Sequence, residues 1–336
     1  MICGAAQQAR WFREQPRFTF PHSLLERVVQ IAFPNSSVVE LEPLRGGFRN
    51  ANFKIKLSCM PDSIVLRIYE HDPSLCQKEM DLMRLIAGSL PVPELIYAEP
   101  NGWDDFPPFT LVRYIEGISF HELKRSGETK AIAQAAHSVG ETLAAIGRMN
   151  FSTSGWLAQG LRVMDPHFEN TNAVPYFIDD CLESPNLRER VPSTVRKLVR
   201  AFAWSMTAEL ANLGPRTQLV HGDFGKRNVL VRLAEGRWKV AAILDWEFAL
   251  SGTPLVDIGR FLRYERKSRP VAEPQFSVGY LEAGGKLPRD WRQLARLIDL
   301  AALSESLTHD ELPDAVVTEL IELVHATAEN REPELS

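Results

Sequence analysis

The chain has 336 residues, which exceeds one typical domain and is enough to bury a large core, so two lobes are expected. Its composition is that of an ordinary globular protein, which excludes disordered, fibrous and collagen-like classes. The net charge of −5, from 38 basic and 43 acidic residues, predicts neither a nucleic-acid nor a membrane partner.

The N-terminal third has the pattern of a small α+β lobe. Apolar residues at helical spacing predict a helix over 22–33, and a second amphipathic pattern predicts one over 75–86. Strand patterns occupy 37–44, 53–57, 63–70, 94–98 and 109–115. The order helix, three strands, helix, two strands describes a first lobe over residues 1–112.

The remainder, residues 113–336, has a mostly helical pattern. Two apolar runs, 229–233 and 240–244, are joined by a polar turn containing Gly236, which predicts a β-hairpin. Helical patterns cover 130–149, 192–213, 276–284, 290–307 and 314–328. We therefore expect a larger lobe of helices around one small β element.

The cysteines and the N-terminus indicate the compartment. The four cysteines are scattered without a C-x-x-C pair, which predicts neither a zinc site nor a disulfide framework and favours a reducing compartment. No apolar run approaches the length of a membrane span, and the first residues lack the pattern of a secretory signal. We expect a cytoplasmic protein.

Polar residues flank both ends of the predicted hairpin. The tripeptide HGD, 221–223, comes just before it, and Asn228 lies five residues beyond Asp223. Asp245 comes just after it. Because a hairpin brings its two ends together, these two carboxylates and one carboxamide are expected to converge. Such a set suits a hard divalent cation and a polarised hydroxyl nucleophile, the requirements of phosphoryl transfer.

Each of these residues has a functional and a simpler interpretation. Asp223 is the candidate that activates or orients a substrate hydroxyl, and Asn228 and Asp245 are candidate magnesium ligands. The alternative for Asp245 is that it caps a turn or pairs with an arginine. His221 is either a general base or, as we prefer, a ring that hydrogen-bonds the backbone and fixes the loop. For Asp257 we expect a helix-capping or loop-bracing role.

The small lobe carries a possible nucleotide site. Arg67 lies in a predicted strand and Glu79 in the next helix, and such a pair would hold a guanidinium against nucleotide phosphates. The alternative is that both side chains simply face water. Gly46 and Gly47 lie in a loop between two strands, where accessible backbone amides suit phosphates, although a Gly-Gly pair by itself indicates only a turn.

The segments HGDFGKRN, 221–228, and ILDWEFALSGTPLVDIGRF, 243–261, resemble the aminoglycoside phosphotransferase family, a branch of the protein-kinase-like fold that includes choline and fructosamine kinases. The resemblance covers about residues 40–265. It implies a two-lobed α+β fold with a small antiparallel β-sheet N-lobe and a larger, mainly helical C-lobe. It also implies ATP and Mg²⁺ as cofactors.

Carried over to this chain, the resemblance implies that Asp223 is the catalytic aspartate and that Asn228 and Asp245 hold magnesium. Arg67 matches the strand position where kinases usually carry a lysine, and Glu79 matches its helix partner. Arginine keeps the charge but is a wider, forked donor.

The resemblance also implies two nucleotide-binding segments. Residues 111–117 resemble the connection between the lobes, where backbone groups meet adenine. Gly47, with Asn50 following, matches the loop over the phosphates. The candidates for the adenine contacts are Arg113, Tyr114 and Ile115.

The implied reaction is ATP-dependent transfer of the γ-phosphate to a hydroxyl of a small molecule. The acceptor is expected beside the C-terminal helices, whose acidic residues would attract a cationic acceptor unless they are merely solvated. These acids are Asp299, Glu305, Asp310, Glu311, Asp314, Glu319 and Glu322. An aminoglycoside, an amino alcohol such as choline and a sugar remain alternatives, as does a regulatory nucleotide-binding module. A protein kinase is disfavoured, because 245–257 is too short for a long activation loop.

Overall fold

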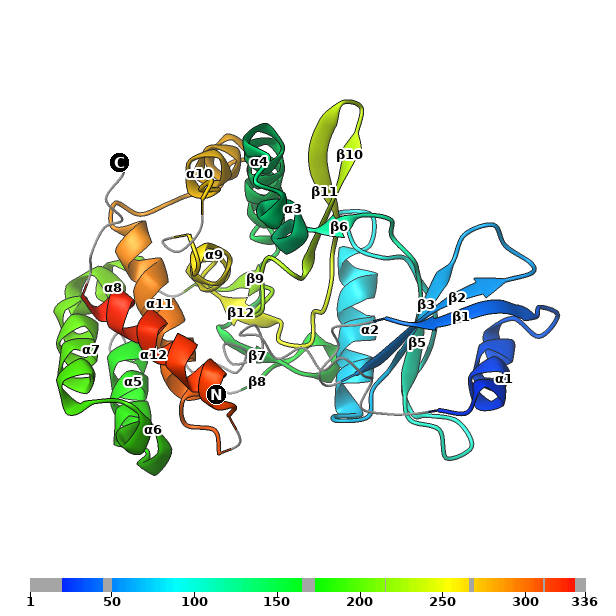
Figure 1. Ribbon diagram of the computed structural model, residues 1–336, viewed down its shortest axis with the longest axis horizontal. Helices are drawn as coiled ribbons and strands as arrows, with labels where there is room; N and C mark the ends of the chain where they lie inside the picture. Colours follow the sequence, from blue (N-terminus) through cyan, green and yellow to red (C-terminus); the bar gives the residue numbers. More distant parts are fainter. Residues whose placement is uncertain are drawn as a thin grey trace.

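The computed structural model describes residues 20–44, 50–164, 173–214, 216–265, 269–310 and 312–329. Figure 1 shows a β-rich N-terminal lobe and a larger lobe that is mostly helical. The hairpin of β10 (Val229–Ala234) and β11 (Arg237–Ile243) projects between them. The predicted two-lobed α+β architecture is therefore present.

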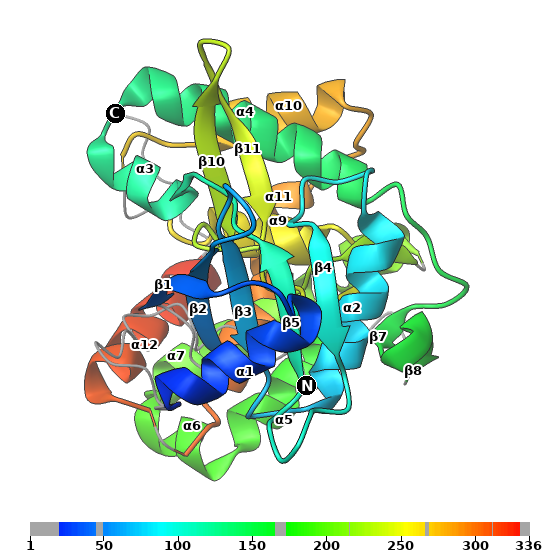
Figure 2. The same ribbon diagram turned by 90° about the vertical axis from the view of Figure 1, so that its right-hand side faces the viewer.

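The N-terminal lobe is a five-stranded antiparallel sheet in the order β1-β2-β3-β5-β4. Every second side chain of the two central strands β2 and β3 is buried, as expected for a half-covered sheet. Helix α1 (His22–Ala32) crosses the sheet (Figure 2), and α2 (Ser74–Ile86) lies beside it. All five predicted strands and both predicted helices are confirmed. The strands are β1 (Val38–Pro43), β2 (Ala51–Leu57), β3 (Ile64–Ile68), β4 (Leu95–Glu99) and β5 (Phe109–Arg113).

The larger lobe contains the predicted helices and several that the sequence did not predict. The pattern over 192–213 is two helices rather than one, because the backbone leaves helical geometry at Met206 (φ −101°, ψ 13°). Helices α3, α5 and α6 were not predicted. The helices of this lobe are α3 (Phe120–Ser126), α4 (Thr129–Ile146), α5 (Ala173–Glu183), α6 (Pro185–Arg190), α7 (Ser193–Ser205), α8 (Thr207–Leu213), α9 (Leu255–Leu262), α10 (Glu273–Glu282), α11 (Trp291–Ser306) and α12 (Asp314–Ala328), with a 3₁₀ turn η2 (Gln159–Leu161).

The expectation of one small β element in this lobe is wrong, because two small sheets are present. The predicted hairpin is confirmed and turns at Glu235 and Gly236, which both have positive φ, as two-residue hairpin turns require. It forms a three-stranded sheet with β6 (Ile118–Ser119). The second sheet has the order β8 (Val163–Met164), β7 (Gly155–Leu157), β12 (Leu250–Gly252) and β9 (Gln218–Val220). Strands this short leave no detectable alternation in a sequence.

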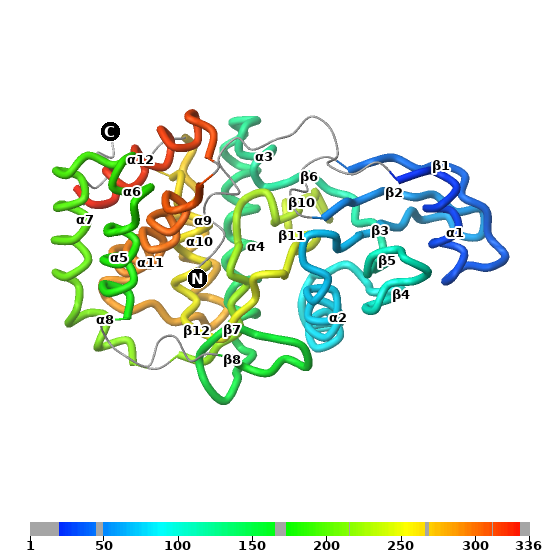
Figure 3. The backbone as a smooth tube through the Cα atoms, turned by 90° about the horizontal axis from the view of Figure 1, so that it is seen from below, coloured from blue at the N-terminus to red at the C-terminus, as the bar shows by residue number. Residues whose placement is uncertain are grey.

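Two hydrophobic clusters form the core. One joins α1 to the five-stranded sheet, and the other fills the larger lobe. Leu82 and Ile86 of α2 belong to the second cluster, so α2 connects the two lobes. Seen from below, α11 and α12 lie with α5 and α7 at the end away from the five-stranded sheet (Figure 3). A boundary between residues 112 and 113 stays a prediction.

Within the described ranges, no helix is both long and apolar enough to cross a membrane.

Candidate active site

A loop over residues 221–228 connects β9 to β10 and begins with a backbone contact that requires glycine. Gly222 has a φ of +80°, and a Cβ there would lie 2.1 Å from the carbonyl oxygen of Phe248. Both the left-handed backbone and the lack of space exclude a larger residue. The loop is thus packed directly against the segment that follows β11.

His221 and Asp257 hold the start of this loop. The Nε2 of His221 donates to the carbonyl oxygen of Leu244 at 2.9 Å, and its Nδ1 accepts the Asp223 N–H at 3.2 Å. Burial lowers the pKa of His221 to about 4, so the ring is neutral. Asp257 accepts the N–H groups of His221 and Gly222 at 2.8 and 2.9 Å. The expected backbone-fixing role of His221 and the loop-bracing role of Asp257 are confirmed.

The Asp223 carboxylate is buried and held from two sides. Asn228 Nδ2 donates to its Oδ2 at 3.0 Å and to its carbonyl oxygen at 2.9 Å. From α9, Arg260 donates to Oδ1 through Nε at 2.8 Å and also through Nη2. Burial raises the pKa of Asp223 to about 6, although the Arg260 charge opposes this shift. At neutral pH the carboxylate is therefore ionised.

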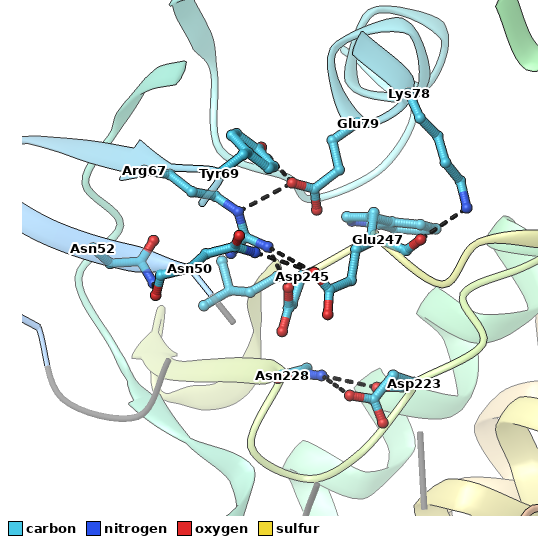
Figure 4. Close-up of polar contacts among 12 residues, drawn as sticks. Asn50, Asn52, Arg67, Tyr69, Lys78, Glu79, Asp223, Asn228, Asp245 and Glu247 are labelled. Atoms are coloured by element: carbon cyan, nitrogen blue, oxygen red, sulfur yellow. Dashed lines mark hydrogen bonds and ion pairs between the residues drawn. The ribbon is translucent and has the colours of Figure 1, made fainter. Parts of the chain in front are cut away.

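Asp245 lies opposite this loop with a strained backbone. Its φ of +68° is in the left-handed region, which non-glycine residues adopt mainly where the surrounding structure imposes it. The next residue, Trp246, is buried and packs its indole against the His221 ring with centroids 4.5 Å apart. The Oδ1 of Asp245 lies 2.5 Å from Arg67 Nη2 (Figure 4). The arginine pairing that was an alternative for Asp245 is present.

Arg67 and Glu79 form the ion pair expected from the sequence. Arg67 Nε lies 3.0 Å from Glu79 Oε2, which also accepts a hydrogen bond from the Tyr69 hydroxyl. Burial acts to lower the pKa of Arg67, but the charges of Glu79 and Asp245 outweigh burial and raise it well above its usual value. Arg67 is thus a permanent cation placed between two acidic residues.

Three residues of the N-terminal lobe contact the segment 245–247, and two of them were missed. Lys78 Nζ donates to the carbonyl oxygen of Glu247 at 2.8 Å, and Asn50 Nδ2 donates to Glu247 Oε2 at 3.1 Å. Arg67 Nη2 lies 3.8 Å from the same carboxylate oxygen. The sequence pointed to Asp245 and Glu79, but no pattern in it distinguished their neighbours Glu247 and Lys78 as site residues. Asn50 was noted only because it follows the loop that contains Gly46 and Gly47.

A cavity of about 670 Å³ lies between the lobes, and Asn50, Arg67 and Glu247 are among the residues that line it. The predicted site residues that share this cavity are Arg67, Glu79, Arg113, Tyr114, Ile115, Asp223, Asn228 and Asp245. Gly46 and Gly47 fall within 45–49, outside the described residues.

The three candidates for adenine contacts differ in what they offer. The Arg113 guanidinium binds Glu94 at 2.7 Å and Asp62 at 3.2 Å on the surface. The N–H groups of Arg113 and Tyr114 donate to the carbonyl oxygens of Glu94 and Ser63. Of the three, only Ile115 has an N–H without an acceptor among the described residues, and its contact with a base stays a prediction.

The residues proposed as metal ligands fit a magnesium ion chemically. Asn228 turns Nδ2 toward Asp223, which leaves its Oδ1 for a cation. Asp245 has its Oδ1 on Arg67 and a second carboxylate oxygen. In the described part of the chain, no group of three or more His, Cys, Asp or Glu residues is arranged to hold a metal. Two oxygen ligands suffice for Mg²⁺, which keeps several waters and binds substrate phosphates.

The acidic residues near the C-terminus do not form a wall of this cavity. Asp299 is buried against Arg263, whose Nε and Nη2 lie 2.8 and 2.5 Å from its carboxylate oxygens. Asp310 accepts a hydrogen bond from Asn186 at 2.7 Å. None of the described acids of this group lines the cavity, and Glu311 lies outside the described residues. The charge argument for a cationic acceptor therefore does not hold at this site.

Comparison with known proteins gives one family match and several structures of similar fold. A model of the phosphotransferase enzyme family matches residues 40–297. A search of curated proteins gave no match. Several solved structures are similar at identities below 20%, which shows a shared fold.

Three of these structures illustrate the likeness. A thermostable mutant of aminoglycoside phosphotransferase APH(4)-Ia, in a ternary complex with AMP-PNP and hygromycin B, has a TM-score of 0.65 and 19% identity, covering 91% of this chain and 96% of that chain. The GDP and kanamycin complex of APH(2″)-IIIa has a TM-score of 0.70 and 19% identity, covering 93% and 99%. The GDP complex of wild-type aminoglycoside 2′-phosphotransferase-IIIa has a TM-score of 0.69 and 18% identity, covering 92% and 99%.

Proposed function

This chain belongs to the phosphotransferase enzyme family, and from that premise we propose that it transfers the γ-phosphate of ATP to a hydroxyl group of a small molecule. The observation that carries the proposal is the convergence of Asp223, Asn228 and Asp245 with the Arg67–Glu79 ion pair in one cavity. Acid, amide and guanidinium groups so arranged supply the positioning and charge that phosphoryl transfer requires.

The residues of this chain have separate tasks in the proposed reaction. The acceptor hydroxyl oxygen forms a bond to the γ-phosphorus, and the bond from that phosphorus to the bridging oxygen breaks. The bridging electron pair leaves with ADP, and the hydroxyl proton passes to Asp223. Arg67, oriented by Glu79, holds the phosphates, and the Ile115 backbone contacts the base.

Asn228 and Asp245 are the residues that would hold Mg²⁺. When bound, the ion supplies positive charge against the β- and γ-phosphates. Arg67 already contacts the Asp245 carboxylate, so ion and guanidinium share that group.

The acceptor class is open among three chemistries. Similar structures carry hygromycin B or kanamycin, which favours an aminoglycoside-like acceptor. The described C-terminal acids do not line the cavity, so their charge gives no reason to require a cationic acceptor. An uncharged sugar therefore remains an alternative, as does an amino alcohol. A cytoplasmic location stays a prediction, with which the free thiols of Cys59, Cys76 and Cys181 are compatible.

A screen of ATP consumption tests the proposal. The purified protein with Mg²⁺ and ATP is given kanamycin, hygromycin B, choline and simple sugars, and ADP release is measured. We expect turnover with one class and, in Asp223→Asn, a kcat that is at least roughly 100-fold lower but still measurable. Stabilisation by AMP-PNP in a thermal shift assay, measured alongside, reports binding separately. Binding of AMP-PNP without turnover of any acceptor would favour the regulatory module instead.

A further inference from the structure

Helix α9 contacts the loop of Asp223 through two side chains one helical turn apart. Asp257 accepts the N–H groups of His221 and Gly222, so it fixes the backbone. Arg260, three residues later, donates to the Asp223 carboxylate, so it fixes the side chain. Both groups are buried, and neither lines the cavity, whereas Asp223 does.

The hydrogen bonds on Asp223 distinguish its two oxygens. A carboxylate accepts at about four lone-pair positions, two on each oxygen. Arg260 fills both positions of Oδ1 with Nε and Nη2. Asn228 fills one position of Oδ2. Among the described residues this leaves one acceptor position, and it is on Oδ2.

We propose that Arg260 is a positioning residue that occupies Oδ1 of Asp223 and thereby makes Oδ2 the oxygen that accepts the hydroxyl proton. This inference rests on the proposed phosphotransfer. In that reaction the proton moves from the acceptor oxygen to Oδ2 while the acceptor oxygen bonds to the γ-phosphorus. Arg260 stays charged and hydrogen-bonded throughout, and it touches neither substrate.

The same helix supplies a matched control. Arg263, the residue directly after the end of α9, forms a pair of the same chemistry with Asp299 of α11, and this pair is also buried. Neither Arg263 nor Asp299 lines the cavity. Loss of either arginine removes one partner of a buried ion pair. Loss of Arg260 also removes both hydrogen bonds on Oδ1 of Asp223, whereas Arg263 acts on that carboxylate through its charge.

The experiment compares Arg260→Met, Arg260→Lys and Arg263→Met with the wild type. Hydrolysis of Mg·ATP, with water as the acceptor, and transfer to kanamycin are measured as kcat and KM, together with AMP-PNP affinity. We expect kcat of Arg260→Met to fall roughly 100-fold, within the range of a positioned proton acceptor. The KM for ATP and the AMP-PNP affinity are expected to stay near wild type. Arg263→Met should keep the wild-type kcat.

Arg260→Lys and one double variant separate positioning from folding. Arg260→Lys keeps the charge but loses the fork, so it should recover part of the lost kcat and remain folded if Arg260→Met does not. Arg260→Met should cost no additional kcat in an Asp223→Asn background, because it acts only through that carboxylate.

Each outcome decides the inference. The inference is overturned if Arg260→Met has an unchanged or higher kcat, or changes KM without changing kcat. It is also overturned if Arg263→Met loses as much kcat as Arg260→Met. In all these cases the proposed function still stands. A wild-type protein that binds AMP-PNP but shows neither hydrolysis nor transfer overturns the proposed function, and this inference with it.

Discussion

Arg67 Nη2 lies 2.5 Å from Asp245 Oδ1, while Arg67 Nε lies 3.0 Å from Glu79 Oε2. One guanidinium thus joins β3, α2 and the segment that follows the hairpin. Its planar fork makes this possible, because two of its nitrogens face two different carboxylates. The same contact places a cation beside the carboxylate that we propose as a metal ligand, so we expect nucleotide and ion binding to be coupled to this arginine.

Replacing Arg67 should test that coupling. Arg67→Met leaves Glu79, Asp245 and Glu247 without their shared cation, and we expect it to lower the free energy of unfolding by about 3–5 kcal/mol. Arg67→Lys should lose less stability but bind AMP-PNP more weakly than wild type, because a compact ammonium lacks the planar fork that faces two carboxylates at once. Urea unfolding and AMP-PNP titration measure the two effects.

Arg200→Met is a suitable control for these variants. Arg200 also contacts two acidic residues, Asp179 and Glu183, but at 41% side-chain exposure. Its loss should cost only about 0–1 kcal/mol. Equal destabilisation by Arg67→Met and Arg200→Met would contradict a special role for the buried cation.

Asp245→Asn should change the response to magnesium. The carboxamide keeps the size of the side chain but removes the charge that we propose to hold the ion. We expect ATP turnover to fall on the order of 100-fold, with more Mg²⁺ needed for half-maximal rate. Initial rates over a magnesium titration measure both. Asp62→Asn, which loses only the exposed contact to Arg113, should behave as wild type. An unaltered magnesium curve for Asp245→Asn would rule out its role as a ligand.

Gly222→Ala and Gly236→Ala separate backbone strain from close packing. Their φ angles are +80° and +75°, so both substitutions incur a similar conformational cost of about 1 kcal/mol. A Cβ at Gly222 would also meet the Phe248 carbonyl oxygen at 2.1 Å, whereas nothing lies within 4 Å at Gly236. We expect Gly222→Ala to be clearly less stable than Gly236→Ala in thermal unfolding and to lose turnover. Equal melting temperatures would show that the loop moves without cost.

The buried Asp257 should make stability depend on pH. Burial raises its pKa from the ordinary 3.8 to about 7. Between these values the folded protein keeps a proton that the unfolded chain has released, so the contribution of Asp257 to the free energy of unfolding falls as pH rises from about 4 to about 7. The lowered pKa of His221 contributes in the opposite direction over the same range, so Asp257→Asn should make the slope of stability against pH less negative or more positive. Urea midpoints across that range provide the measurement, and an equally steep slope in the variant would contradict the assignment.

Local patterns of apolar and polar residues in the sequence predicted much of the fold. Apolar residues at alternating positions predicted β2 and β3 correctly, because every second side chain of a half-buried strand faces the core. The polar turn at Gly236 predicted the hairpin correctly. The strands β6 to β9 and β12 were missed, since segments of two or three residues carry no period. The break at Met206 was missed because the apolar spacing runs through it.

The sequence by itself determined the chemistry of the site: Asp223, Asn228 and Asp245 at the two ends of one hairpin, whose closure brings them together whatever surrounds it. Tertiary structure alone decided the partners of these groups. Arg67 and Asp245 are 178 residues apart, and Arg260 reaches Asp223 from a separate helix. The sequence does not distinguish a charged residue on a solvated surface from one in a buried ion pair. Only tertiary packing therefore decides which carboxylate each arginine neutralises.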